Sequence, residues 1–236
     1  MLIDKYVFNR EECWYKKHCP QYKKEICRED SIRYYQMYFL LNQAGIPKKR
    51  QYITPMSPAE CDEEEFDRLA EIQDNIEEWV NEGNNLYLFS SNCGNYKTTW
   101  AIKLMCQYFN KIWHGNGFQC RGLFVSVGKF LLDCKRNISD PIPNFLEYLQ
   151  TMRECDLVIF DDIGEFELTV YEQQNLMDII NERIYNERSC IFTSNVIDRE
   201  LKNNIGPRLY SRILNTSEVI EFRGDDRRGD KIRRGV

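Results

Sequence analysis

Long apolar runs are missing from this chain of 236 residues. No stretch of about 18 apolar residues is present, and the first residues, MLIDKYVFNREEC, contain no apolar segment of the signal-peptide type. The sequence therefore predicts no membrane association and favours a cytoplasmic protein. Internal repeats and low-complexity tracts are also absent, while 42% hydrophobic and 13% aromatic residues are enough for a buried core. These features argue against disorder.

Disulfides are not expected either, because a cytoplasmic location keeps the ten cysteines as free thiols or metal ligands. Cys13, Cys19 and Cys27 lie within fifteen residues together with His18, which is enough for a tetrahedral zinc site in a small N-terminal domain. Their spacing is not that of a common zinc finger, and reduced thiols packed as small hydrophobes are the alternative. The other cysteines show no clustering and are interpreted as structural; they include Cys61, Cys93, Cys106 and Cys190.

Charge is unevenly distributed along the chain, whose net charge is −5. Residues 1–50 hold eleven Lys or Arg against six Asp or Glu, and residues 51–236 hold 21 against 31. The last fifteen residues are basic again, with six against three. Basic ends on an acidic middle are compatible with contact to nucleic acid or to an acidic partner, and equally with a solvated surface.

A segment rich in proline and charge, IPKKRQYITPMSPAECDEEE, is the predicted linker at residues 46–65. It places a domain boundary near residue 60, with residues 1–60 as an N-terminal domain and linker and residues 61–236 as a second domain. Apolar residues at helical spacing behind an acidic first turn predict one helix over 66–80.

Short apolar runs then alternate with helical patterns. The expected strands are 85–90, 122–127, 156–162, 189–195 and 217–222, and the expected helices include 98–109, 129–137 and 172–187. Strands this apolar are buried on both faces. The sequence therefore predicts an α/β fold with a mainly parallel sheet covered by helices.

The stretch SSNCGNYKTTW, residues 90–100, lies between a predicted strand and a predicted helix, where a phosphate-binding P-loop belongs. In the pattern G-x-x-x-x-G-K-[ST], Lys97 would reach the β/γ-phosphates and Thr98 would bind Mg²⁺. The two glycine positions hold Ser91 and Tyr96, so a tyrosine stands where the backbone normally approaches a phosphate. The residues expected to contact nucleotide are Asn92, Cys93, Gly94, Asn95, Tyr96, Lys97, Thr98 and Thr99.

Polar residues end two further predicted strands. DLVIFDDIG places Asp161 and Asp162 at the end of an apolar strand, as the expected Mg²⁺ ligand and the acid that activates water. A helix cap or turn is the alternative. SCIFTSN ends in Asn195, which could hold the attacking water or simply begin a turn.

The stretch IGPRLYSRIL places Arg208 and Arg212 on one face of a short helix. An arginine presented to the nucleotide of a neighbouring subunit stabilises the charge of the transferring phosphoryl group. Surface arginines bonded to local carboxylates are the alternative.

These motifs, in this order and with the closing EFRGDDRR, resemble Walker A, Walker B, sensor 1, the arginine-finger helix and the final segment of replicative-helicase loaders from bacteria and phages. Such loaders are AAA+ ATPases of the DnaC/DnaI type and kin of IstB. The resemblance covers about residues 66–228 and departs at Ser91, Tyr96 and Asp162, where many AAA+ proteins have glycine, glycine and glutamate. It implies a three-layer αβα AAA+ domain without a C-terminal lid, and only 24 residues follow Arg212.

The resemblance also implies ligands and partners. It implies ATP and Mg²⁺ as ligands, with Arg212 as the finger and Arg208 near the nucleotide, self-assembly through the AAA+ domains, and ATP hydrolysis that depends on assembly. It further implies a hexameric replicative DNA helicase bound by the N-terminal domain, and single-stranded DNA. For DNA the sequence offers Lys129, Lys135 and Arg136, which could follow the DNA backbone, with Phe130 nearby to stack on a base, although exposed lysines need no ligand. A loader of phage or mobile-element type is the leading hypothesis. A non-catalytic adaptor with a degenerate P-loop and an IstB-like transposition ATPase are the alternatives.

Overall fold

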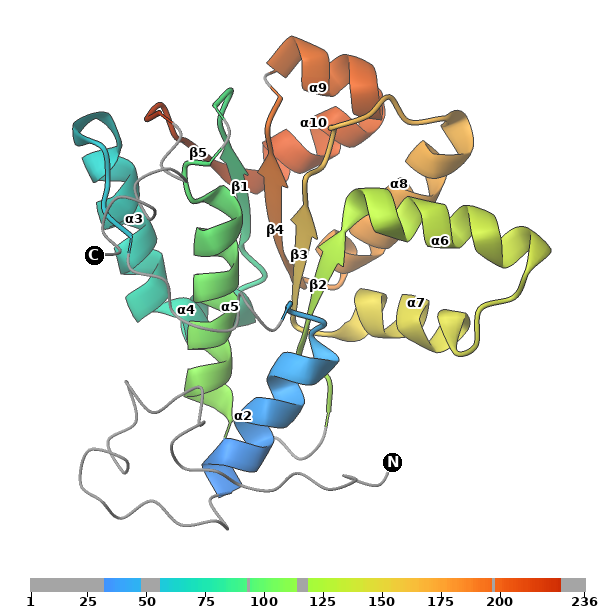
Figure 1. Ribbon diagram of the computed structural model, residues 1–236, viewed down its shortest axis with the longest axis horizontal. Helices are drawn as coiled ribbons and strands as arrows, with labels where there is room; N and C mark the ends of the chain where they lie inside the picture. Colours follow the sequence, from blue (N-terminus) through green and yellow to red (C-terminus); the bar gives the residue numbers. More distant parts are fainter. Residues whose placement is uncertain (1–31, 48–55, 93, 114–118, 197, 226–236) are drawn as a thin grey trace, which may run out of the picture.

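A parallel five-stranded sheet forms the centre of the computed structural model, which describes residues 32–47, 56–92, 94–113, 119–196 and 198–225 (Figure 1). The strand order is β2-β3-β4-β1-β5. Because every pairing is parallel, the carboxyl ends of β3, β4 and β1 lie side by side at one edge. The strands are β1 Asn85–Phe89, β2 Gly122–Ser126, β3 Leu157–Asp161, β4 Ser189–Ser194 and β5 Ser217–Glu221.

Helices cover both faces of the sheet. In one hydrophobic cluster, helices α2, α3, α4 and α5 pack on sheet side chains such as Leu86 and Ile191. In a second cluster, helices α6, α7, α8, α9 and α10 pack on sheet side chains such as Tyr87 and Phe192. Residues 86 and 87 therefore point to opposite faces, as alternation along a strand requires. The predicted three-layer α/β fold is confirmed. The helices are α2 Ile32–Gln43, α3 Glu63–Asp74, α4 Ile76–Asn81, α5 Lys97–Ile112, α6 Val127–Ser139, α7 Phe145–Glu154, α8 Val170–Tyr185, α9 Asp198–Ile205 and α10 Pro207–Thr216, with a 3₁₀ turn, η2, at Glu60–Asp62.

The region predicted as one helix over 66–80 forms two helices, and the expectation of one helix is wrong. At Asn75 the backbone leaves the helical region, with φ −105° and ψ 20°, and the chain turns between α3 and α4. The short helices α7 and α9 were not predicted. Among the helices formed by the described residues, none is long and apolar enough to cross a membrane.

Helix α2 packs on α5 and on the edge strand β2. Its side chains Met37, Leu40 and Leu41 are buried in the first cluster, and the amide of Phe124 in β2 donates a hydrogen bond of 2.7 Å to the carbonyl of Ala44. The described part of the predicted N-terminal domain therefore shares a core with the sheet. The division of the chain near residue 60 stays a prediction, because residues 1–31 and 48–55 lie outside the described residues.

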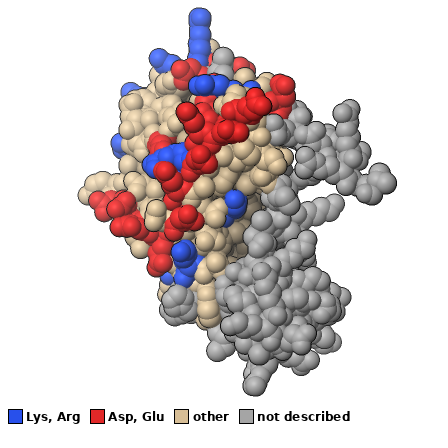
Figure 2. All heavy atoms as spheres, turned by 90° about the vertical axis from the view of Figure 1, so that its left-hand side faces the viewer, with Lys and Arg blue, Asp and Glu red and all other residues tan. Residues whose placement is uncertain are grey.

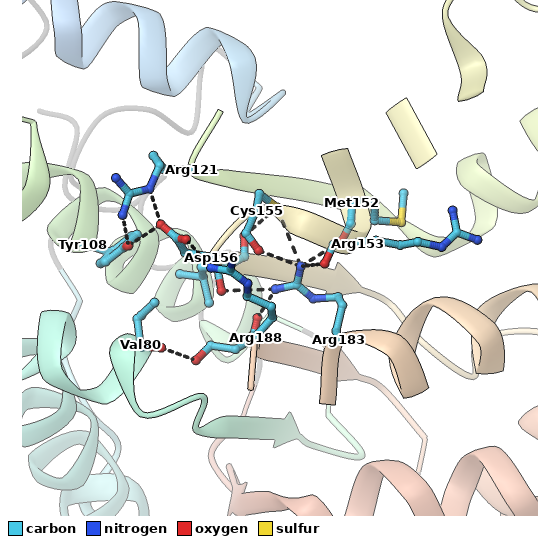
Figure 3. Close-up of polar contacts among 11 residues, drawn as sticks. Val80, Tyr108, Arg121, Met152, Arg153, Cys155, Asp156, Arg183 and Arg188 are labelled. Carbon is cyan, nitrogen blue, oxygen red and sulfur yellow. Dashed lines mark hydrogen bonds and ion pairs between the residues drawn. The ribbon is translucent and has the colours of Figure 1, made fainter. Parts of the chain in front are cut away.

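A buried arginine organises the opposite, amino-terminal edge of the sheet (Figure 3). Arg183 of α8 is 0% exposed, and its guanidinium donates to the carbonyls of Met152 and Cys155 at 2.8 Å and of Ser189 at 2.6 Å. It thus ties α8 to the end of α7 and to the start of β4. Burial raises the pKa of the Cys155 thiol to about 12, so this cysteine stays neutral, as expected for a structural residue.

Candidate functional site

The loop between β1 and α5 holds the lysine of the predicted P-loop inside itself. Lys97 is 5% exposed, and its ammonium donates to the carbonyl of Asn92 at 3.1 Å and to Oδ1 of Asn95 at 2.9 Å. The side chain of Asn95 in turn donates to the hydroxyl of Ser90, which also accepts from the amide of Asn92 at 3.0 Å. These bonds shape the loop from its own polar atoms. Cys93 lies outside the described residues.

Tyr96 occupies the glycine position of the loop in a glycine-like conformation. Its φ of 71° and ψ of 4° are left-handed, and Gly94 also has a positive φ of 83°. The ring of Tyr96 meets Phe66 of α3 edge-on, with ring centroids 6.3 Å apart, and packs against the first hydrophobic cluster. Tyr96 therefore adopts a positive φ, the kind of backbone conformation for which glycine is the usual residue, at the position where the motif has glycine.

The segment after β5 braces the loop from the side of α3. Asp62 is 3% exposed, and its carboxylate accepts the amide of Arg223 at 2.7 Å and the amide of Gly224 at 3.1 Å. The side-chain amide of Asn92 donates to the carbonyl of Gly224 at 3.2 Å. Sequence reasoning missed Asp62, because it stands in an acidic run whose other acidic members are exposed or half-buried, and nothing in the run marks it as the buried one.

The polar ends of β3 and β4 form one hydrogen-bonded group. The side-chain amide of Asn195 donates to Oδ1 of Asp162 at 3.1 Å, and the hydroxyl of Thr193 donates to Oδ1 of Asp161 at 2.7 Å. The structure thus brings the three predicted residues together. Thr193 was not predicted; the signal was a hydroxyl residue within the otherwise apolar strand SCIFTSN.

Strand order places this group beside the loop. Strand β4 lies between β3 and β1, and the amide of Ser90, where the loop begins, donates to the carbonyl of Ser194 at 3.3 Å. Asn195 therefore follows the one strand that lies between the two aspartates and the P-loop. Because neighbouring strands are about 5 Å apart, β3 and β1 each lie about 5 Å from β4. All of these groups share the carboxyl edge of the sheet, where ligands bind in open α/β folds.

The chemistry of these groups fits a magnesium-bound polyphosphate. Lys97 and Thr98 open α5, a helix of 16 residues, whose N-terminus favours anions. The ammonium of Lys97 is bonded to neutral oxygens of Asn92 and Asn95, which phosphate oxygens can replace. Asp161, 6% exposed, supplies the hard carboxylate oxygen that Mg²⁺ prefers. Thr99 lies half-buried in the same turn.

Two predicted arginines lie on a different surface. Arg208 and Arg212 project from α10 and line a groove of about 790 Å³ between α8 and α10. Nε of Arg212 donates to Oδ1 of Asn181 of α8 at 2.6 Å. The structure therefore does not bring these arginines to the P-loop of their own chain.

The predicted stacking role of Phe130 is wrong. Its side chain is 2% exposed because it lies on the face of α6 that packs into the second hydrophobic cluster. Lys135 pairs with Glu172 at 2.9 Å and Arg136 pairs with Asp140 at 3.1 Å, whereas Lys129 is exposed. Lys129, Lys135 and Arg136 therefore all lie at the surface, and two of them are paired with carboxylates.

One face of the molecule is strongly acidic. Figure 2 shows Asp and Glu side chains forming a band over the face that carries α3. A polyanion is repelled by such a face, so DNA is not expected to bind there. Its exposed acidic residues from η2, α3 and α4 and the turn that follows are Glu60, Glu63, Glu64, Asp67, Glu71, Asp74, Glu77, Glu78 and Glu82.

The predicted zinc ligands Cys13, His18, Cys19 and Cys27 lie outside the described residues. Within the part of the chain that the structure describes, no group of three or more His, Cys, Asp or Glu is placed to hold a metal ion. The zinc site stays a prediction.

Fold and site together define a P-loop domain of the AAA+ class, with the loop after β1 and polar residues at the ends of β3 and β4. The chain belongs to the family described as IstB-like ATP binding protein, whose model matches residues 59–234. The predicted resemblance is confirmed at this level. No curated protein matches the chain.

Solved structures share the fold. The crystal structure of the DnaC helicase loader matches with a TM-score of 0.62 at 17% identity, over 75% of this chain and 100% of that one. The crystal structure of DnaI matches with a TM-score of 0.59 at 19% identity, over 78% of this chain and 94% of that one. The structure of AMPPCP-bound DnaA from Aquifex aeolicus matches with a TM-score of 0.58 at 18% identity, over 77% of this chain and 54% of that one.

Proposed function

We propose that this ATP-binding protein is an assembly-dependent ATPase that loads a replicative DNA helicase onto single-stranded DNA. The observation that carries the ATPase proposal is the convergence of Lys97, Asp161, Asp162 and Asn195 at one edge of the sheet. The similarity to the fold of a helicase loader supports the cellular role.

Each residue at this edge has a role that its chemistry allows. Lys97 neutralises phosphate charge, and Thr98 and Asp161 provide the oxygens that hold Mg²⁺. Bound Mg²⁺ supplies charge neutralisation on the phosphates. Asp162 orients and deprotonates the attacking water, and Asn195, bonded to Asp162 at 3.1 Å, holds that carboxylate and the water in place.

Arg212 acts on the nucleotide of a neighbouring copy. It is exposed, lies on α10 away from the loop of its own chain, and is oriented by Asn181. Arg208, four residues earlier on the same helix, contacts the phosphates of that nucleotide. Such an arrangement makes hydrolysis depend on self-assembly.

The helicase is assigned from the resemblance to helicase loaders, and the DNA is assigned from the charges on the surface. Residues 1–60, with the predicted zinc ligands, bind the helicase hexamer. Single-stranded DNA lies away from the acidic α3 face, on the side of α6 that carries Lys129. Its phosphates are attracted to cations and repelled by the carboxylates of α3.

A second candidate is an ATPase that serves transposition, and the family match over residues 59–234 favours it. A third is a non-catalytic adaptor that bridges helicase to DNA or an initiator while binding nucleotide only weakly, which Tyr96 in the P-loop favours.

Two measurements on the full chain separate these candidates. The first is the shift in melting temperature on adding Mg-ATP, for the wild type and for Lys97→Ala, with Lys111→Ala on the same helix as the control. The second is retention of a purified replicative helicase by the tagged protein, with and without ATP. A loader shows a shift that Lys97→Ala abolishes and retains helicase.

Other outcomes point elsewhere. Helicase retention without any ATP-dependent shift indicates the adaptor. Retention of a transposase in place of the helicase indicates the transposition ATPase. An unchanged shift in Lys97→Ala would refute the nucleotide site.

A further inference from the structure

Thr193 lies on β4, directly beside the end of β3 that carries the two aspartates. It is the penultimate residue of β4 and is 0% exposed. Its hydroxyl donates to Oδ1 of Asp161 at 2.7 Å and accepts the amide of Asp162 at 3.0 Å. One side chain therefore contacts both consecutive aspartates, through a carboxylate in one case and the backbone in the other.

The backbone of Thr193 continues this attachment. Its carbonyl accepts the amide of Ile163 at 2.9 Å. Thr193 thus bonds to three successive residues at and after the end of β3, namely Asp161, Asp162 and Ile163. The middle residue, Asp162, has a left-handed φ of 59°, a conformation that needs such support in a residue other than glycine.

A hydroxyl is suited to this position because it donates one hydrogen bond and accepts others at the same atom. The donated bond fixes the orientation of the Asp161 carboxylate, and the accepted bond fixes the turn from which Asp162 projects. Partners that orient a metal ligand contribute to the affinity for the metal, and their loss typically costs about 10 to 100-fold in metal affinity.

We propose that Thr193 is a positioning residue of the nucleotide site, which holds Asp161 in the orientation that binds Mg²⁺ and couples it to the turn of Asp162. The proposal rests on the proposed ATPase function. It assigns Thr193 no contact with the nucleotide itself.

The test compares Thr193→Val with Thr193→Ser. Valine keeps the branched shape and removes the hydroxyl, whereas serine keeps the hydroxyl and removes a methyl group. The readout is binding of a fluorescent ATP analogue at increasing Mg²⁺ concentration and, separately, in EDTA. The melting temperature of each variant without ligand reports any purely structural effect.

The expected result is a split between metal and nucleotide. Thr193→Val raises the Mg²⁺ concentration at half-maximal binding by about 10 to 100-fold, Thr193→Ser stays close to wild type, and binding in EDTA is the same in all three proteins. In an Asp161→Asn background, Thr193→Val adds no further loss, because the carboxylate through which it acts is gone.

Several outcomes would overturn the proposal: wild-type Mg²⁺ dependence in Thr193→Val, an equal loss in Thr193→Ser, or an additive loss in the Asp161→Asn background. If Thr193→Val does not fold, Thr193→Cys, whose thiol is a weak donor, takes its place with the same expectations. Failure of the wild type to bind the analogue at any Mg²⁺ concentration would reject the proposed function itself, which distinguishes the two failures.

Discussion

At the scale of single residues, Tyr96 shows that a loop position can require a conformation without requiring a particular residue. The left-handed backbone costs a residue with a Cβ about 1–2 kcal/mol relative to glycine. An aromatic contact of the kind made with Phe66 contributes about 0.5–1.5 kcal/mol beyond the area it buries. The two effects are of similar size, so tyrosine in this loop is compatible with a formed P-loop.

The variants Tyr96→Gly and Tyr96→Ala separate these two effects. Both lose the contact with Phe66, but only glycine relieves the strain of the positive φ of 71°. We expect Tyr96→Ala to be less stable than Tyr96→Gly by about 1–2 kcal/mol in urea unfolding. Equal stabilities would show that the left-handed conformation is not strained. We further expect Tyr96→Gly to tighten ATP binding or to leave it unchanged.

The two aspartates should respond differently to loss of charge. Asp161→Asn should weaken Mg²⁺-dependent nucleotide binding, because it removes the proposed metal ligand. Asp162→Asn should leave binding intact and slow hydrolysis by about 10²-fold or more, because asparagine tolerates the left-handed turn but cannot accept a proton. Titrations of nucleotide with Mg²⁺ and steady-state turnover are the measurements. Identical behaviour of the two variants would contradict this division of roles.

At the scale of helices and strands, the buried strands could be predicted because each is a nearly continuous apolar run, as expected of a strand that is covered on both faces. Residues 156–162 illustrate this, since β3 spans Leu157–Asp161 and Asp161 ends it as expected. The prediction of one helix over 66–80 was wrong because the backbone turns at Asn75, where the sequence has no proline or glycine to indicate a helix end. Thr193 was missed because its role depends on β3 lying beside β4, a fact of topology that local sequence does not contain.

Helix α8 begins with a capping box that makes stability depend on pH. Thr169 and Glu172 bond reciprocally, and Lys135 pairs with Glu172 at 2.9 Å. Burial acts to raise the pKa of Glu172, but the hydrogen bonds from Lys135 and Thr169 outweigh it and hold the pKa below its ordinary value of 4.5. Because the folded-state pKa is lowered, this stabilisation is present above pH 4.5 and is lost as the pH falls through the lowered value.

We therefore expect Glu172→Gln to lower the free energy of unfolding by about 1 kcal/mol at neutral pH, with the difference from wild type shrinking in acid. Urea unfolding between neutral pH and pH 3 measures this. Glu154→Gln, a change of an exposed carboxylate on α7, is the control. A difference that does not change with pH would mean that the charge of Glu172 plays no part.

At the scale of the whole molecule, the P-loop and the arginines of α10 lie on separate surfaces, so the proposed site is completed only between copies. Arg212→Ala should retain nucleotide affinity and lose turnover by about 10³-fold. Arg208→Ala is the matched comparison on the same helix and should have a smaller effect. Turnover as a function of protein concentration checks both. A proportional loss of affinity in Arg212→Ala would place this arginine in the binding of its own nucleotide.

The packing of α2 has a practical consequence for anyone who shortens this chain. The family match begins at residue 59, but α2 lies before it, covers apolar surface of α5 and bonds to the outer strand through Ala44. A fragment cut to residues 59–234 would expose that surface together with an unprotected strand edge, the combination that promotes aggregation through edge-to-edge pairing. A fragment that begins at residue 32 keeps the helix and should remain monodisperse in size-exclusion chromatography, where the shorter one should not.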